Sequence, residues 1–192
     1  MSLKHAWLIA AGLLFMLCPA VQAQEIKYTT YVMDHDYFSC EIPADWGFDR
    51  DAEGDEEYRI YEITIPVPGP MSDINLRCLL KDNEDFSGYQ DFLNRNSRNV
   101  LGETKNSRES YGPVTKIKLA GRDAFSLRRD RTVFLHPESK SDESAAISEI
   151  IYVLPMEDGS FYVLHYRAAA DRFQEFLPVF EHVAASFKPG KP

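Results

Sequence analysis

The chain is poor in basic residues. Its 192 residues include 21 Lys and Arg against 30 Asp and Glu, which gives a formal net charge of −9 at pH 7. Nucleic acids and anionic lipid headgroups are bound mainly through Lys and Arg. This charge therefore argues against a nucleic-acid partner and against docking on anionic headgroups.

Long apolar runs and the common catalytic motifs are also missing. Beyond the N-terminal region, no apolar run approaches the ~20 residues that a membrane-spanning helix needs, so we expect no transmembrane span in the mature chain. The sequence contains no G-x-S-x-G nucleophile elbow, no H-E-x-x-H metal pair, and no G-x-G-x-x-G or Walker phosphate loop. We therefore predict that the protein is not an enzyme and has no cofactor.

The chain does carry an N-terminal export pattern. A short basic start precedes an uncharged apolar run over 6–18, and the small-x-small site Val21-Gln22-Ala23 follows it. This order is typical of a secretory signal peptide. We predict a signal peptide over 1–23, cleavage near Ala23-Gln24, and a single globular domain over 24–192 that is periplasmic or secreted.

Three cysteines are present. Cys18 lies in the predicted signal peptide and would be lipidated if that segment were a lipoprotein signal, although Leu17 before it is not typical of one. Cys40 and Cys78 share the parity of the apolar positions in two alternating runs, and exported proteins favour disulfides. They form either a disulfide between neighbouring strands or two unlinked buried thiols.

The apolar periodicity predicts an α+β domain. Alternating residues indicate seven strands, over 37–43, 58–67, 73–81, 114–119, 124–135, 147–154 and 160–168. Helical spacing indicates one helix from Asp85 to Val100 and another from Asp171 to Phe187, with a kink or break at Pro178. Short connections favour mostly antiparallel pairing, and the two helices must cover the sheet.

Three short motifs resemble those of the PsbP-like and DcrB-like family. They are the opening segment from Phe38 to Trp46, the turn from Leu119 to Ala124, and the closing helix from Asp171 to Lys188. The resemblance implies an α/β/α sandwich around a central, mostly antiparallel sheet of about seven strands with two main helices. Members of this family are mostly accessory or binding proteins. The matching residues are core and turn positions, so no functional residue is transferred from the family.

An acidic segment partly imitates a calcium loop. Oxygen ligands alternate along it and a glycine stands at the sixth position, as Ca²⁺ binding requires. However, the twelfth position, where a bidentate carboxylate is expected, is Ile60. The weak metal candidates are Asp49, Asp51, Glu53 and Asp55. His165 lies in an alternating apolar strand, so we expect a core or edge histidine with satisfied hydrogen bonds rather than a ligand.

The most basic stretch of the chain, 116–131, contains the candidates for an anion or partner docking site: Arg128, Arg129 and Arg131. Arg129 and Arg131 share the parity of apolar residues in the same strand. Charges on an apolar face must find partners. They either pair with acidic segments of the chain or form the docking site.

These observations favour an exported, non-enzymatic binding or accessory protein of the cell envelope that acts through a partner protein or a small ligand. An envelope-stress or transport accessory protein at the inner membrane is the alternative. A metal-binding protein or a hydrolase is a weaker alternative, because the required motifs are missing.

Overall fold

The computed structural model describes residues 26–50, 52, 55–136, 138–139 and 142–190. The predicted signal peptide (1–23), its cleavage site and Cys18 lie outside these residues. Within the described residues, no helix combines the length and apolar character needed to cross a membrane.

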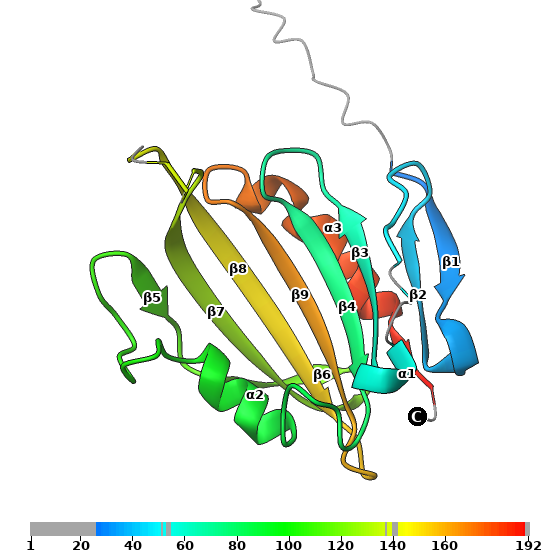
Figure 1. Cartoon of the computed structure of the whole chain (residues 1–192). Helices are drawn as coiled ribbons and strands as arrows, with labels where there is room; N and C mark the ends of the chain where they lie inside the picture. Colours follow the sequence, from blue (N-terminus) through cyan, green and yellow to red (C-terminus); the bar gives the residue numbers. More distant parts are fainter. Residues whose placement is uncertain (1–25, 51, 53–54, 137, 140–141, 191–192) are drawn as a thin grey trace, which may run out of the picture.

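Strands dominate the described chain, and Figure 1 shows their arrangement. The strands are β1 (Tyr28–Val32), β2 (Phe38–Pro43), β3 (Ile60–Pro66), β4 (Asp73–Leu79), β5 (Glu109–Tyr111), β6 (Thr115–Leu119), β7 (Arg122–Phe134), β8 (Ser144–Pro155), β9 (Phe161–Ala169) and β10 (Lys188–Pro189). The helices are α1 (Asp55–Tyr58), α2 (Tyr89–Asn96), α3 (Phe173–Ser186) and a short 3-10 helix, Asp34–Asp36.

Two antiparallel sheets form the framework. The larger has seven strands in the order β3-β4-β9-β8-β7-β5, and β6 also pairs with β7. The smaller sheet has the order β1-β2-β10. The predicted α+β class and the seven-stranded antiparallel sheet are therefore confirmed. The predicted strand 37–43, however, lies outside the large sheet, because β1 and β10 occupy both edges of β2.

The two faces of the large sheet are covered differently. On one face α3 and the small sheet enclose the main core, in which Phe180 stacks on Tyr166 with ring centroids 5.7 Å apart. On the other face, Phe92 and Leu93 of α2 cover a smaller apolar cluster. Figure 1 shows α2 crossing one end of the sheet, so the other end of this face has no helix over it.

The helix α3 continues through Pro178, so a break at that residue is wrong, while the alternative of a kink there stays a prediction. Proline removes the hydrogen bond to the carbonyl four residues earlier, which belongs to Gln174. Gln174 is exposed, so water can satisfy that carbonyl. The buried stripe of α3, which includes Phe173, Phe180 and Val183, runs past the proline and keeps the helix on the sheet.

The predicted disulfide is not formed in the structure, where Cys40 and Cys78 are both free and buried. The prediction assumed that their strands are neighbours in one sheet. Cys40 instead lies in β2 of the small sheet, whereas Cys78 lies in β4 of the large sheet between β3 and β9. Both thiols pack in the main core as small apolar groups, and burial raises the pKa of each to about 12.

Candidate functional site

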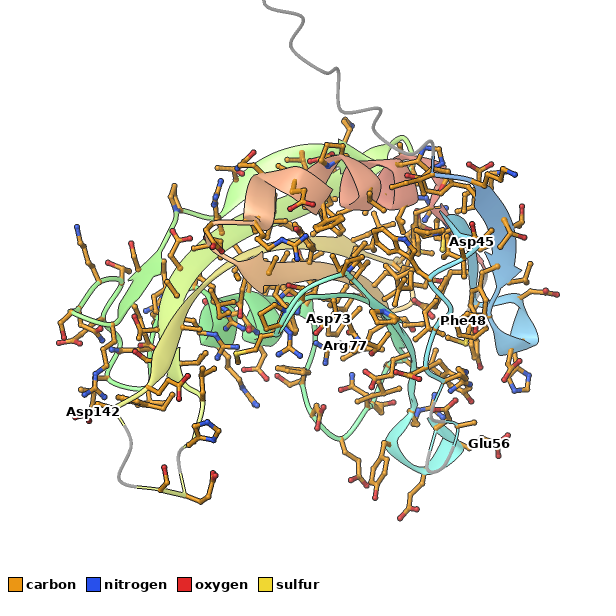
Figure 2. All side chains as sticks on the ribbon, turned by 90° about the horizontal axis from the view of Figure 1, so that it is seen from above. Asp45, Phe48, Glu56, Asp73, Arg77 and Asp142 are labelled. Carbon is orange, nitrogen blue, oxygen red and sulfur yellow. The ribbon has the colours of Figure 1, made fainter. Side chains whose placement is uncertain are left out.

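A row of alternating charges crosses the partly open face of the large sheet. The strand register places four residues side by side on β4, β9, β8 and β7: Asp73, Arg167, Glu149 and Arg129. We call these four residues the charged row. They lie on the α2 face because they alternate along each strand with residues that enter the main core, such as Ile74 on β4. Figure 2 shows Asp73 on the side of the sheet away from α3.

Glu149 is the centre of this row, and its side chain is fully buried. Arg129 donates a hydrogen bond from Nε to Oε2, and Arg131 donates one from Nε to Oε1 at 2.8 Å. His165 Nε2 lies 3.6 Å from Oε2. Burial acts to raise the pKa of Glu149, but His165 and Arg129 outweigh it and lower that pKa to about 2. The carboxylate is therefore ionised at neutral pH.

His165 is the neutral member of the cluster. Burial lowers its pKa, and the charges of Arg129 and Arg77 act in the same direction, whereas Glu149 opposes them. Burial is the dominant effect because the side chain is only 12% exposed. At neutral pH the imidazole therefore adds no positive charge beside Glu149.

Near the charged row, three buried polar atoms of the sheet have no hydrogen-bond partner among the described residues. They are Asn75 Oδ1, Arg77 Nε and His165 Nε2. Asn75 and Arg77 alternate with core residues on β4, and Asn75 pairs in register with His165. Figure 2 shows Arg77 on the same side of the sheet as Asp73. Buried polar atoms without partners cost free energy, so these three atoms make the site chemically incomplete.

Arg77 has a weak counter-ion. The nearest carboxylate oxygen with which it pairs is Glu62 Oε2, 3.8 Å from Nε, and Glu62 is 42% exposed. Burial lowers the pKa of the Arg77 guanidinium, although it remains far above neutral pH. On the α2 face, Arg129 and Arg131 thus share the fully buried Glu149, whereas Arg77 on β4 pairs with Glu62 at 3.8 Å.

The structure separates the three arginines that the sequence singled out. Arg129 and Arg131 both reach Glu149 on the α2 face. Arg128 points to the opposite face, where its guanidinium lies 4.7 Å from the ring centroid of Phe173. Neighbouring residues of a strand face opposite sides, so these three residues do not form one patch. The docking role assigned to them from the sequence stays a prediction.

Sequence reasoning missed the acid that organises the cluster. Glu149 shares the parity of the buried residues Ile147, Ile151 and Val153 on β8, which is the same signal that identified Arg129. Asn75 and Arg77 do not show this signal, because on β4 they alternate with the buried residues Ile74, Leu76 and Cys78. The pairing of Glu149 with Arg129 depends on the register between β7 and β8.

The calcium candidates are only partly described. Asp51 and Glu53 lie outside the described residues. Asp49 pairs with Thr64 through backbone hydrogen bonds, and the carboxylate of Asp55 forms an ion pair with Arg50. Within the described part of the chain, no group of three or more His, Cys, Asp or Glu side chains is arranged to hold a metal ion. A calcium site here stays a prediction.

Comparisons with known proteins identify the fold. No protein-family model matches the chain, and no curated protein matches it in sequence. The solved structure of cyanobacterial PsbP (CyanoP) from Synechocystis superposes with a TM-score of 0.53 at 11% identity, covering 91% of this chain and 99% of that chain.

Two further structures show weaker likeness. LpqN, involved in cell envelope biogenesis of Mycobacterium tuberculosis, gives a TM-score of 0.46 at 16% identity over 86% of this chain and 92% of that one. PA94, a protein of unknown function from Pseudomonas aeruginosa, gives 0.44 at 12% identity over 86% and 99%. The resemblance to DcrB-like proteins stays a prediction. The match to CyanoP shows that this chain has a PsbP-like fold.

Proposed function

We propose that this is an exported, non-enzymatic binding protein of the cell envelope, and that its partly open sheet face binds an acidic segment of a partner protein. The export pattern over 1–23 and the missing catalytic motifs support the first part. The PsbP-like fold is compatible with it, although a fold does not determine function. The second part depends on the incomplete cluster beside the charged row.

The observation that carries the proposal is the unused pair of buried atoms on β4. Arg77 Nε is a donor and Asn75 Oδ1 is an acceptor, and neither has a hydrogen-bond partner among the described residues. Residues two apart on a strand face the same side, about 7 Å apart. An acidic peptide segment offers the complementary groups, since its carboxylate accepts from Arg77 and a backbone N–H donates to Asn75.

The energetics of the site also favour an anionic group. Arg77 is 23% exposed, so the outer edge of its guanidinium meets solvent, while its Nε is buried. Hydrogen bonds to charged groups contribute about 1.5–3 kcal/mol, more than neutral ones. The counter-ion of Arg77, Glu62, is 3.8 Å away and 42% exposed, so an incoming carboxylate can form a closer ion pair with this guanidinium.

Site-specific photocrosslinking in an exporting host tests this proposal. A photoreactive amino acid replaces Thr64, which pairs in register with Asn75, and in a second protein it replaces the exposed Gln174 on α3. We expect a discrete protein adduct at position 64 and none at 174. Arg77→Met should abolish the adduct, because it removes the donor and the charge.

The matched control is Arg122→Met, which removes an exposed guanidinium at the first residue of β7. This variant should leave the adduct at position 64 intact. An adduct that is insensitive to Arg77→Met, or equally strong at position 174, would contradict the proposed binding face.

A further inference from the structure

The turn after α2 exposes two consecutive aliphatic side chains. Val100 is 102% exposed and Leu101 is 79% exposed, whereas the next most exposed large apolar residue described, Val32, is 52% exposed. We call Val100 and Leu101 the apolar tip. Single exposed apolar residues are common in soluble proteins, but a pair held out at the end of one turn needs a separate explanation.

Hydrogen bonds centred on Asn99 hold the tip in this conformation. Asn99 Oδ1 accepts from the backbone N–H groups of Leu101 at 3.0 Å and Glu103 at 2.9 Å. The Asn99 carbonyl accepts from Gly102 N, and Asn99 N donates to the Glu103 carbonyl, both at 2.9 Å. Gly102 has a φ of +82°, which suits glycine in a tight turn. The turn is therefore held by hydrogen bonds of the residues on either side of the tip, together with the N–H group of Leu101.

The residues around the tip are basic. The segment 95–108 carries four cationic side chains and one acidic side chain, and one of the four, Arg95, is paired with Asp91 of α2 at 2.8 Å. Arg98 and Lys105 form no ion pair among the described residues, and Arg108 packs over the ring of Phe134 at 4.9 Å. Figure 1 shows the loop between α2 and β5 projecting beyond the edge of the sheet.

We propose that the apolar tip inserts into the interfacial region of an anionic phospholipid surface. At the interface the two aliphatic side chains leave water, while backbone groups of the turn can still bond to water and headgroups. Arg98 and Lys105 lie close enough in sequence to meet the phosphates at headgroup level. The overall negative charge does not prevent this contact, because salt screens charges more than about 10 Å from the tip.

Tryptophan fluorescence with brominated lipids tests the insertion directly. Leu101→Trp places a reporter at the tip, and Val32→Trp places one on β1, at the other side of the molecule in Figure 1. The full chain is mixed with vesicles of phosphatidylcholine and phosphatidylglycerol in equal parts. The signal of the parent protein, from Trp7 and Trp46, is subtracted. We expect a blue shift and quenching at position 101 and neither at position 32.

The local readout is needed because the apolar run over 6–18 binds lipid wherever it is retained. Arg98→Ala should weaken the interaction at position 101 about fivefold, since one basic residue near an anionic surface contributes about that factor. Lys27→Ala, next to β1, is the matched control and should have no effect.

Several results would overturn the proposal. The tryptophan at position 101 could keep the emission wavelength of a water-exposed residue, or the tryptophan at position 32 could be quenched equally. Lys27→Ala and Arg98→Ala could weaken the interaction equally, or insertion into pure phosphatidylcholine could be undiminished. If the emission of the tryptophan at position 101 does not shift with vesicles and shifts only in a complex with a protein, the tip belongs to a protein interface instead.

Discussion

Replacing Glu149 by Gln should be one of the most destabilising polar substitutions in this protein. The side chain is fully buried and accepts hydrogen bonds from Arg129 and Arg131, which are 17% and 32% exposed. Glutamine keeps the shape but removes the negative charge and turns an N–H₂ group toward one guanidinium. Removing one partner of a buried ion pair costs about 3–5 kcal/mol. We expect about 3 kcal/mol, because Arg131 can turn toward water.

The same carboxylate gives the substitution a pH signature. The pKa of Glu149 is about 2 in the folded protein, below the 4.5 of an unperturbed glutamate. A lowered folded pKa gives stabilisation that is complete above the unfolded value and is lost as the pH falls toward the folded value. The difference in unfolding free energy between wild type and Glu149→Gln should therefore be largest at neutral pH and shrink between about pH 4.5 and pH 2.

Urea unfolding at a series of pH values measures both effects. Glu175→Gln is the matched control, since Glu175 pairs with Arg172 at the surface of α3 and its loss should leave the urea midpoint nearly unchanged. A loss below about 1 kcal/mol for Glu149→Gln, the level of an exposed ion pair, would refute the reasoning. It would mean that hydration, rather than Glu149, stabilises the charges of Arg129 and Arg131.

Three further predictions follow from the buried groups. Burial lowers the folded pKa of His165 below its unfolded value near 6.5, so its contribution to stability falls as the pH drops below ~6.5, and His165→Gln should flatten this part of the urea-midpoint curve. Phe180→Ala removes a fully buried ring between Tyr152 and Tyr166 and should lower the free energy of unfolding by about 3–5 kcal/mol, measured by the same titration. Cys40 and Cys78 should resist a thiol reagent in the folded protein and react in urea without prior reduction, whereas no reaction at these two residues in urea would show that they are bridged.

Strands with one buried face were predictable from the sequence, and strands without one were not. The strand β4 alternates clearly because every second residue enters the main core, whereas β8 and β9 contain longer apolar runs because part of each strand is buried on both faces. In β1, no residue is fully buried, so its sequence lacks an apolar rhythm. The three residues of β5 are too few to show a period, and the segment around them reads as a polar loop. The sequence also placed the start of α2 too early, at Asp85 rather than Tyr89.

The candidate site was predictable only in part, for a related reason. Arg129 and Arg131 stood out because they are charged residues at the parity of an apolar face, and Glu149 carries the same signal on β8. Arg129 lies opposite Glu149 because of the register between β7, which has 13 residues, and β8, which has 12. Alternation identifies a face but not the position along it, so several acids were possible partners for these arginines.

The position of the charged row follows from the lengths of the elements. The eight residues of α2 make a helix about 12 Å long, whereas the twelve residues of β8 extend over about 40 Å. One such helix covers less than half of the sheet face, and the apolar cluster under Phe92 and Leu93 ends where α2 ends, at Asn96, which accepts a hydrogen bond from Arg129. Beyond that point the sheet needs side chains that tolerate water, and charged residues in alternating pairs satisfy this need. The uncovered half can therefore serve as a binding surface without any cost to the main core on the other face.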